Sequence, residues 1–385
     1  MLLAANLFLG LGLFLLLTKY LLILVHRPRP LKARELKNPR FAVLVPARYE
    51  SSVIEDLFKS FENQTYKISP QDIYIIVEAA SDPTVVLARN YGYQVFVRPH
   101  PEKQRKGYAL DEAVRAILKQ EHYDAYFIFD ADNTLSPTYF AEMKRSFERG
   151  YALAIGCRKI KNPENAVAVG SGLIFTIVNV IMNRIYSGRG LSCIASGTGF
   201  YLSGEIVEQE RGFPFHSLTE DYEISLFAAT HGYSTYYNRR AVFYDAQPRT
   251  YTQYFIQRAR WEKGYFEARL KYLGPLLRGL LGKRFAVSYI LLIGIFDLLF
   301  LVVGLVLLII YFAVQALWLL PLFLFDLYFV LILFTALLLH LENYPLKPAL
   351  YIKTLFFHPL LLLTYIPCLF VAIFKRRLSW CRIDH

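Results

Sequence analysis

Residues 41–50 read Phe41-Ala-Val-Leu-Val45-Pro46-Ala-Arg-Tyr-Glu50, a short apolar run that opens into a polar loop. Apolar runs of this length, bounded by turn residues, are typical of buried strands. Further along the chain, similar runs alternate with helical patterns: a helix at 53–61, a strand at 73–77, a strand at 94–97, a helix at 108–118 and a strand at 126–129. This alternation predicts an α/β domain with a mostly parallel, doubly wound sheet.

Acidic residues stand at the carboxyl ends of three of these predicted strands. Glu50 lies in the loop after the first strand, Glu78 follows the second, and Asp130 and Asp132 follow the fourth. Such sheets bind their ligands outside the carboxyl ends of the strands. The Asp-x-Asp pattern suits a hard divalent cation, Mg²⁺ or Mn²⁺, held against a diphosphate. Asp-rich turns also follow strands without any ligand, so it is the shared edge of the sheet that favours a metal site.

A second group of polar motifs begins with Thr219-Glu220-Asp221, at the start of a helical run over 222–230. A Thr followed by acids is typical of a capped helix N-terminus. A capped turn also fixes a carboxylate rigidly, and a fixed carboxylate can act as a general base toward a hydroxyl. We therefore expect Thr219 to cap the helix and Asp221 to be held in place.

The stretch Gln257-Arg258-Ala259-Arg260-Trp261 lies on a helical pattern over 251–265. Arg260 and Trp261 follow Gln257 by three and four residues, so these three side chains share one helix face. Arg binds phosphate oxygens and Trp offers a broad apolar surface, which predicts a pocket for a pyrophosphate and a ring-shaped group. The alternative is a belt of Trp and Arg at a membrane interface. Arg258, off this face, is predicted to be structural or to contact lipid.

Apolar sequence of membrane-spanning length begins at the N-terminus. Residues 2–25 predict a transmembrane anchor over 1–26 rather than a cleaved signal peptide, because no positive n-region or small-residue cleavage site precedes them. Basic residues crowd 27–40 and place the following domain, 41–270, in the cytosol of a multi-pass plasma-membrane protein. The apolar run at 166–186 contains several polar residues and is predicted to be a core or surface helix rather than a span.

The C-terminal membrane region, 271–385, is predicted to hold two spans at about 285–312 and about 319–340. A third apolar segment, at about 351–374, contains Pro359 and Pro367, which are expected to break it. Basic residues at 375–377 prefer the cytosolic side, so this segment is predicted to be re-entrant or interfacial, with a full span as the alternative. The end of the chain, 380–385, either folds back under the soluble domain or frays.

Composition argues against several function classes. The net charge is +12, but no nucleic-acid-binding motif is present, and much of the charge flanks apolar segments, where anionic lipid explains it. The four cysteines are widely spaced: Cys157, Cys193, Cys368 and Cys381. Their spacing disfavours structural zinc and a disulfide framework and fits a reducing compartment.

The order of the motifs carries a resemblance. Pro46-Ala-Arg-x-Glu50, Glu78, Asp130-x-Asp132, Thr219-Glu-Asp221 and Gln257-x-x-Arg260-Trp261 occur in this sequence between apolar segments. The set resembles the membrane-bound family 2 glycosyltransferases, the group of cellulose, chitin, hyaluronan and poly-N-acetylglucosamine synthases. The resemblance implies a cytosolic GT-A domain, Rossmann-like and nucleotide-sugar-binding, followed by transmembrane helices. It implies inverting, metal-dependent transfer from a nucleotide-diphosphate sugar, expected to be a UDP-sugar, to a polysaccharide or lipid-linked acceptor.

The same resemblance implies roles for single residues. Asp130 and Asp132 are expected to hold the metal and the donor diphosphate, and Asp221, with Glu220 beside it, to act as the catalytic base. Gate residues of the pocket are expected to be Gln257, Arg260 and Trp261. Donor contacts are expected from Ala47, Arg48, Glu50, Glu78, Arg105 and Lys106. The chain departs from the family pattern at Glu78 and Asp245, where Asp and Glu are usual, and at Tyr49, where Asn is common.

Two alternatives stay open. One is a glycosyltransferase that adds a single sugar to a lipid, similar to the ceramide glucosyltransferases, because few spans leave little wall for a polymer channel. The other is a polysaccharide-export component with a degenerate domain, which the intact acidic residues disfavour. Membrane lipid is an expected partner, nucleic acid is not, and the sequence is compatible with an oligomer.

Overall fold

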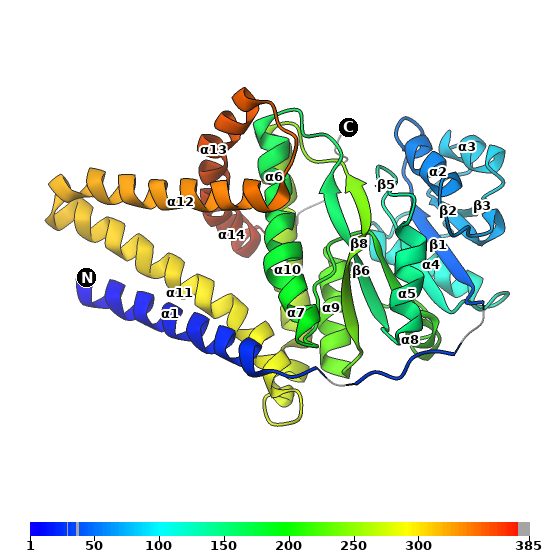
Figure 1. Ribbon diagram of the computed structural model, residues 1–385, viewed down its shortest axis with the longest axis horizontal. Coiled ribbons are helices and arrows are strands. Elements are labelled where there is room, and N and C mark those ends of the chain that lie inside the picture. The colour runs from blue at the N-terminus through cyan, green and yellow to red at the C-terminus, as the bar shows by residue number, and fades with distance from the viewer. Residues whose placement is uncertain (29, 36–37, 376–385) are drawn as a thin grey trace.

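The computed structural model describes residues 1–28, 30–35 and 38–375 and shows a sheet domain from which apolar helices project on one side (Figure 1). Within these residues the sheet has eight strands in the order β3-β2-β1-β4-β7-β6-β8-β5. The strands are β1 (Phe41–Pro46), β2 (Ile73–Val77), β3 (Gln94–Val97), β4 (Ala125–Ile128), β5 (Thr134–Leu135), β6 (Leu153–Ile160), β7 (Phe200–Ser203) and β8 (Thr235–Asp245). Each strand predicted from the sequence is present close to its predicted bounds, which confirms the α/β fold class.

The sheet is parallel in its first half and mixed in its second. β1 pairs in parallel with β2 and β4, and β2 with β3. β6 pairs in parallel with β8, whereas β7 runs antiparallel to β4 and β6, and β5 to β8. The sheet is therefore mostly parallel, as expected, with β7 and β5 reversed. After β6 a helix runs back along the sheet, opposite to the direction of β6. Residues 189–199 then run in the direction of β6 again, and in this stretch the Ser196 carbonyl accepts from Arg158 Nη1 at 2.7 Å. Because residues 189–199 bring the chain back to the carboxyl end of β6, the next strand, β7, runs in the opposite direction.

Helices cover both faces of the sheet. Their apolar residues recur at helical spacing, as Ile54, Leu57, Phe58 and Phe61 do on α2, so each helix buries one stripe against the strands. One core lies under α2, α3 and α5, and the other under α4, α8, α9 and α10. The elements of the sheet domain are α2 (Ile54–Glu62), η1 (Pro70–Asp72), α3 (Thr84–Asn90), α4 (Lys106–Ile117), α5 (Tyr139–Glu148), α8 (Gly204–Gln209), α9 (Glu220–His231) and α10 (Tyr251–Gly279). Helix α10 crosses the domain boundary predicted at residue 270.

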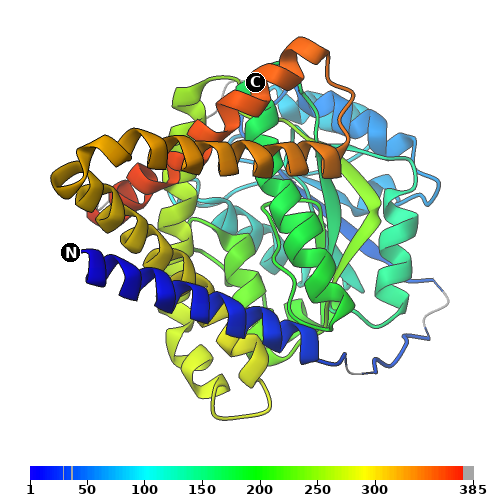
Figure 2. The same cartoon turned by 60° about the vertical axis from the view of Figure 1, so that its left-hand side comes forward.

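The first apolar helix packs on one from the opposite end of the chain. Helices α1 (Leu2–Val25) and α11 (Phe285–Gln315) lie side by side in both views (Figures 1 and 2). A Cβ atom on Gly12 would lie 3.0 Å from the Leu301 backbone nitrogen, and one on Gly304 would lie 2.9 Å from that of Leu9. Small residues let helix backbones approach this closely, so the two glycines fix the register of the pair.

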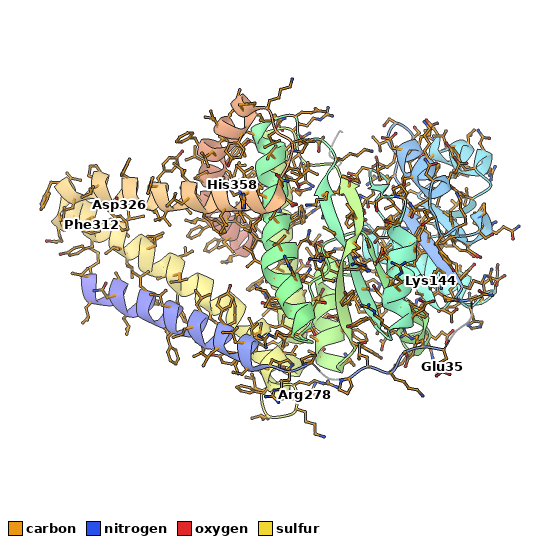
Figure 3. The ribbon with its side chains drawn as sticks, viewed as in Figure 1. Glu35, Lys144, Arg278, Phe312, Asp326 and His358 are labelled. Atoms are coloured by element: carbon orange, nitrogen blue, oxygen red, sulfur yellow. The ribbon has the colours of Figure 1, made fainter. Side chains whose placement is uncertain are left out.

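The remaining apolar helices follow α11. They are η3 (Leu317–Leu319), α12 (Leu320–Glu342), α13 (Pro348–Leu363) and α14 (Tyr365–Phe374). Among the residues that the structure describes, five segments are long and apolar enough to cross a membrane: 2–25, 166–188, 285–315, 317–342 and 348–374. These segments indicate a membrane protein. Asp326 lies near the end of α12 that is far from the sheet domain, beside Phe312 (Figure 3).

The C-terminal apolar segment is broken, but not at the first of its prolines. Pro359 lies inside α13, and the break comes after Leu363, with Pro367 in the first turn of α14. The expectation that Pro359 ends the helix is therefore wrong, because packing on α6 and α12 holds the turns on either side of it. Helix α14 lies along α10, where Lys263 Nζ donates to the Ala372 carbonyl at 3.1 Å. The residues predicted to fold back or fray, 380–385, lie outside the described part of the chain.

The apolar run at 166–186 forms a helix in three parts, as expected for a packed helix. These parts are α6 (Ala166–Thr176), the π-helical η2 (Ile177–Asn183) and α7 (Arg184–Gly188). Of its most apolar stretch, 61% is buried, against β6 on one side and α13 on the other. Contacts are close: a Cβ on Gly170 would lie 2.6 Å from a Leu361 methyl group. This helix therefore joins the sheet domain to the C-terminal apolar helices.

A buried ion pair makes a second joint between the two regions. Lys159 Nζ on β6 lies 2.6 Å from Glu342 Oε2 at the end of α12, and the Glu342 side chain is only 3% exposed. Removing one partner leaves a buried charge unpaired, which is more costly than removing both. We expect Lys159→Met to lower the free energy of unfolding by about 3 kcal/mol and Lys159→Met/Glu342→Leu to recover most of the loss. Thermal unfolding in detergent measures both, and equal losses in the single and double variants would contradict the expectation.

Candidate active site

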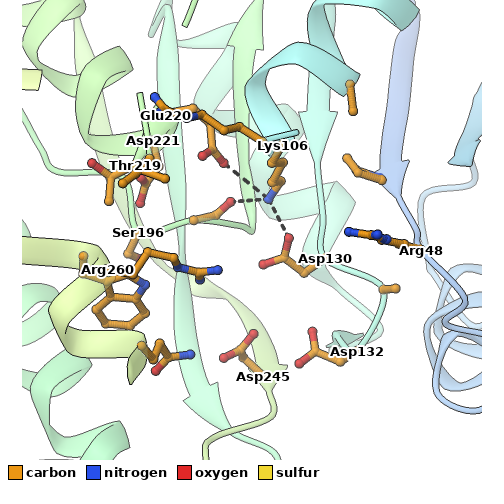
Figure 4. Close-up of a pocket in the computed structure, with 18 of the residues that line it drawn as sticks. Arg48, Lys106, Asp130, Asp132, Ser196, Thr219, Glu220, Asp221, Asp245 and Arg260 are labelled. Atoms are coloured by element: carbon orange, nitrogen blue, oxygen red, sulfur yellow. Dashed lines mark hydrogen bonds and ion pairs between the residues drawn. The ribbon is translucent and has the colours of Figure 1, made fainter. Parts of the chain in front are cut away.

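The carboxyl ends of β1, β2, β4 and β8 meet the first turns of α4 and α9 around a cavity of about 300 Å³ (Figure 4). Helix α10 closes one side of it. The site residues predicted from the sequence all line this cavity: Ala47, Arg48, Glu50, Glu78, Arg105, Lys106, Asp130, Asp132, Glu220, Asp221, Gln257, Arg260 and Trp261. The fold thus brings them together, and their chemical roles stay predictions.

Three carboxylates gather at the floor of the cavity. One oxygen from each of Asp130, Asp132 and Asp245 lies within 4.8 Å of the others. Burial and the charges of Asp245 and Asp130 raise the pKa of Asp132 well above its usual value, and burial also raises the pKa of Asp245. Repulsion among three oxygen donors is what a hard divalent cation relieves, so the residues fit such an ion.

Asp245 is a functional candidate that the sequence analysis missed. It ends β8, and its carboxylate is held by Arg158 Nε at 3.0 Å, Asn133 Nδ2 at 2.9 Å and Gln247 Nε2 at 2.7 Å. The sequence pointed to it only as a departure from the family pattern. An acid at the carboxyl end of a strand, the same signal that picked out Asp130, was present and could have found it.

The ammonium of Lys106 connects the two acidic groups of the site. Its Nζ donates to Asp130 Oδ1 at 2.5 Å and to the Gly197 carbonyl at 2.7 Å, and lies 3.7 Å from Glu220 Oε1 (Figure 4). Burial lowers the pKa of a lysine, but here the charges of Asp130 and Glu220 outweigh it and the pKa is raised. Lys106 is therefore a fixed cation beside the carboxylate cluster.

The backbone around Arg105 is unusual. Arg105 has a φ of 121°, a value that side chains rarely adopt, and its Nη1 donates to the His216 carbonyl at 2.9 Å and to Glu267 at 3.2 Å. Gly107 is required next to it, because a Cβ there would lie 1.9 Å from the Phe215 carbonyl oxygen. Strained backbone of this kind is typical of functional sites. It places Lys106 inside the cavity and turns the Arg105 guanidinium toward α10.

Glu220 and Asp221 occupy the first turn of α9, opposite the carboxylate cluster. Both are buried. Burial raises the pKa of Asp221, while hydrogen bonds from the backbone amides of Tyr222 and Gly197 hold its carboxylate and oppose the rise. Burial raises the pKa of Glu220 to about 7, with Lys106 opposing and Asp221 adding to the rise. Asp221 is thus the more firmly anchored of the two carboxylates.

Thr219 stands at the N-cap of α9, but its side chain caps nothing. Its Oγ1 is buried and accepts no hydrogen bond from the helix. The predicted cap is wrong because the hydroxyl faces α10, where a Cβ on Gly264 would lie 2.6 Å from it. The turn is held instead by Glu223, whose Oε2 accepts from the Ser217 amide at 2.8 Å.

Helix α10 begins with a capping box between Thr250 and Gln253 and then presents its polar stretch to the cavity. The Arg260 guanidinium points into the cavity toward Asp130 (Figure 4). The indole of Trp261 meets Phe175 edge-on, with ring centroids 5.6 Å apart. Gln257, Arg260 and Trp261 therefore line a pocket, which favours that interpretation over an interfacial belt.

A cluster of opposite charges lines the far side of the cavity. Arg48 Nε lies 2.9 Å from Glu78 Oε2, and Arg98 Nη1 lies 3.7 Å from Glu78 Oε1. Arg98 is also bound to Glu112 at 3.1 Å and is almost fully buried. The sequence analysis missed Arg98, although it directly follows β3 at the same edge of the sheet as Glu78.

The pKa of Glu220 has a consequence for stability. The folded protein holds the Glu220 proton up to about pH 7, whereas the unfolded chain releases it near 4.5, so the stabilisation present below 4.5 is lost as the pH rises through 7. We expect Glu220→Gln, which mimics the protonated form, to raise the melting temperature relative to wild type more at about pH 8 than at about pH 5. Thermal unfolding in EDTA at both pH values measures this. A difference that is independent of pH would contradict the expectation.

Comparisons with known proteins agree with this geometry. Residues 39–264 match the family described as "Glycosyltransferase like family 2". The probable glycosyltransferase YdaM of Bacillus subtilis is 24% identical over 260 residues, which cover 62% of this chain and 58% of that protein. The chain thus matches little more than half the length of this curated relative.

Among solved structures, the mannosyltransferase PcManGT from Pyrobaculum calidifontis, in complex with GDP-Man and Mn²⁺, is similar in fold. Its TM-score is 0.65 at 16% identity, and the similarity covers 98% of this chain and 100% of that one. With the family match over more than half of the residues, it confirms the GT-A fold with apolar helices expected from the sequence. The chain therefore belongs to the family described as "Glycosyltransferase like family 2".

Proposed function

We propose that the protein is an inverting, metal-dependent glycosyltransferase of the membrane surface that takes a UDP-sugar as donor. The observation that carries the proposal is the arrangement of opposite charges across one cavity. Lys106 Nζ lies 2.5 Å from Asp130 and 3.7 Å from Glu220, the neighbour of Asp221, and Arg260 lines the same cavity. Such a site holds a diphosphate at one end and a proton acceptor at the other.

The carboxylate cluster supports a divalent cation, Mg²⁺ or Mn²⁺, held by Asp130, Asp132 and Asp245. When bound, the ion would neutralise charge on the leaving diphosphate. PcManGT was solved with Mn²⁺, which is consistent with this assignment. Lys106 and Arg260 supply fixed positive charge from the protein itself, so the diphosphate is contacted by cations on more than one side.

The transfer step follows from the position of Asp221. An acceptor hydroxyl gives its proton to the Asp221 carboxylate while its oxygen forms a bond to the anomeric carbon of the sugar. The bond from that carbon to the diphosphate oxygen breaks, and the nucleoside diphosphate leaves with the electron pair. Attack from the face opposite the leaving group inverts the anomeric centre. The backbone amides that hold Asp221 orient it for this step.

The far side of the cavity supports uracil as the base. Glu78 is an acceptor flanked by the donors Arg48 and Arg98. Uracil presents the complementary order, an N–H donor between two carbonyl acceptors, whereas the corresponding edge of guanine has one acceptor and two donors. PcManGT binds GDP-Man, so the two nucleotides are the informative pair to compare.

The apolar helices support an acceptor at the membrane. Trp261 and Phe175 form an aromatic wall on the side of the cavity next to α6 and α10, which pack on α13 and α14. Basic residues at 27–40 favour a cytosolic sheet domain at the plasma membrane, as predicted from the sequence. The acceptor is then a growing polysaccharide or a lipid-linked sugar.

A screen of nucleotide sugars tests the proposal. The purified full chain in detergent, with Mn²⁺, is incubated with UDP- and GDP-sugars, and release of nucleoside diphosphate is measured. We expect release from at least one UDP-sugar, suppression by EDTA and little release from GDP-mannose. No release from any donor would overturn the proposed function, and release from GDP-mannose alone would overturn the assignment of uracil.

A second candidate is transfer of a single sugar to a lipid. It is favoured by the small number of apolar helices that project from the sheet domain, which leaves little wall for a polymer channel within one chain. Radiolabelled product separated by size distinguishes the two. One added sugar supports the glycolipid-forming enzyme, and a ladder of lengths supports a polysaccharide synthase.

A further inference from the structure

Arg258 is the bulkiest fully buried side chain among the described residues, and nothing in the transfer step uses it. Its Nη2 donates to Ser171 Oγ on α6 at 2.7 Å. In the part of the chain that the structure describes, its Nε and Nη1 have no hydrogen-bond partner, and no carboxylate lies within ion-pair distance. Full burial makes the predicted lipid contact wrong. The hydroxyl of Tyr365 and the carboxylate of Glu262 also interact with the guanidinium. A fully buried guanidinium without a direct ion pair is nevertheless costly, so its position calls for a role besides packing.

Aromatic rings surround this cation. The Arg258 Cζ lies 3.9 Å from the ring centroid of Trp261, 5.0 Å from that of Tyr254 and 5.8 Å from that of Phe175. Arg258 precedes Trp261 by three residues on α10, so the stacking is built into the helix. Trp261 and Phe175 line the cavity and Arg258 does not. Arg258 therefore reaches the cavity through Trp261, and it reaches the carboxylate cluster through hydrogen bonds that run from Ser171 to Gln247 and from Gln247 to Asp245.

The same rings lead back to the metal-binding cluster. On its other side, Phe175 contacts Arg158, whose Cζ lies 3.7 Å from the ring centroid. Arg158 in turn holds Asp245. A continuous row of contacts thus runs from Asp245 through Arg158 and Phe175 to Trp261, and Arg258 supports the indole from behind, away from the cavity.

We propose that Arg258 is a positioning residue for the acceptor, a proposal that rests on the proposed glycosyl transfer. It clamps the indole of Trp261 against Phe175 and ties α10 to Ser171 on α6. The flat face of the indole is thereby held at a fixed distance from the bond between sugar and diphosphate. An acceptor sugar ring that stacks on this face is presented to Asp221 in one orientation, whereas a water molecule needs no such surface.

Two measurements test the proposal. The chain has three tryptophans, Trp261, Trp318 and Trp380, so Trp318→Phe/Trp380→Phe leaves Trp261 as the only indole emitter. In this background we expect Arg258→Met to shift Trp261 emission to longer wavelength and to increase its quenching by acrylamide. In membrane vesicles given radiolabelled UDP-glucose or UDP-N-acetylglucosamine, we expect the ratio of transfer to hydrolysis to fall about tenfold or more, because misplacing an acceptor slows its attack and not that of water.

Matched variants separate positioning from loss of structure. Arg269→Met is the control, because Arg269 is another arginine of α10 that contacts an aromatic ring. That ring belongs to Tyr222, and neither residue lines the cavity. This variant should change neither the emission of Trp261 nor the ratio of transfer to hydrolysis. Arg258→Lys keeps the charge without the planar stack and should recover part of the ratio. Ser171→Ala removes the anchor together with the 2.8 Å hydrogen bond from Ser171 Oγ to Gln247, and it should act in the same direction as Arg258→Met on Trp261 emission, but less strongly.

The outcomes are distinct. Transfer and hydrolysis that fall equally, or Trp261 emission that does not move in Arg258→Met and Ser171→Ala, would overturn the positioning role. Wild-type vesicles that turn over neither donor would count against the proposed function. In that case the emission of Trp261 still decides whether Arg258 holds the indole.

Discussion

Asp221→Asn is expected to lower the rate of sugar transfer by about 10³-fold, because the amide cannot take the proton of the incoming hydroxyl. The change is nearly isosteric, so the hydrogen bonds from the backbone amides of Tyr222 and Gly197 can still reach the retained carbonyl oxygen. Binding of UDP with Mn²⁺ should stay within about twofold of wild type, since the diphosphate contacts lie across the cavity. Transfer of radiolabelled sugar and calorimetric titration with UDP measure the two quantities.

Glu223→Gln provides the control for this variant. Glu223 is a buried carboxylate of the same helix, two residues on, that does not itself line the cavity; it binds Lys271 and the amide of Ser217, and the Gln side chain keeps an acceptor oxygen for that amide. Glu223→Gln should lower the stability of the protein and leave the turnover of the folded protein within about threefold of wild type. Near wild-type turnover in Asp221→Asn would refute the base assignment, and a large loss of UDP binding would recast Asp221 as a donor ligand.

Asp132→Asn is expected to weaken the affinity for Mn²⁺ strongly, because it removes a proposed metal ligand. Losing a residue that only hydrogen-bonds to a metal ligand typically weakens metal affinity by roughly 10- to 100-fold, and the loss here should be larger. The Asp132 carboxylate is one of three that lie within 4.8 Å of one another, and the amide supplies only a weaker neutral oxygen. Transfer should collapse at low Mn²⁺ and recover in part at saturating Mn²⁺. Activity is measured over a series of metal concentrations, with binding of Mn²⁺ followed by electron paramagnetic resonance.

Asp56→Asn is the matched control, because Asp56 is an exposed aspartate that is not one of the three clustered carboxylates; its partner Lys161 also donates to the Asp132 backbone carbonyl at 3.2 Å, a contact that the substitution does not remove. It should leave the metal dependence unchanged. A variant at Asp132 whose activity needs no more metal than wild type would remove this residue from the ligand set. The remaining pair, Asp130 and Asp245, would then have to hold the ion with the donor.

The sequence predicted the strands and which residues lie around one cavity, but it did not predict the direction of β7. Strand ends are local features, so Glu78 and Asp130 could be placed at one edge from apolar runs alone. The direction of β7 depends on residues 189–199, which have no periodic pattern and follow the surface of neighbouring elements. The sequence of 189–199 does not show whether the chain runs along the sheet once more before β7 or enters β7 directly from the preceding helix.

Side-chain partners were harder to predict because they come from distant parts of the chain. Thr219 has the sequence of a helix cap, but its hydroxyl faces Gly264, a contact that only the packing of α10 on α9 creates. Arg258 was predicted to be either structural or in contact with lipid, because the helical pattern alone does not show that α6 covers that side of α10. Asp245 had a local signal at the end of its strand, but the sequence analysis named it only as a departure from the family pattern.

The pairing of α1 with α11 also imposes an order on biosynthesis. Thr18 and Tyr289, which touch at 2.7 Å across this pair, are 271 residues apart in the chain. At translation rates of roughly 5–20 residues per second, α1 waits on the order of tens of seconds before α11 leaves the ribosome. The whole catalytic cavity is synthesised during that interval, while Gly12 still has no Leu301 to pack on. The sheet domain is therefore tethered at one end while it folds, and the docking of α11 on α1 joins its two ends only afterwards.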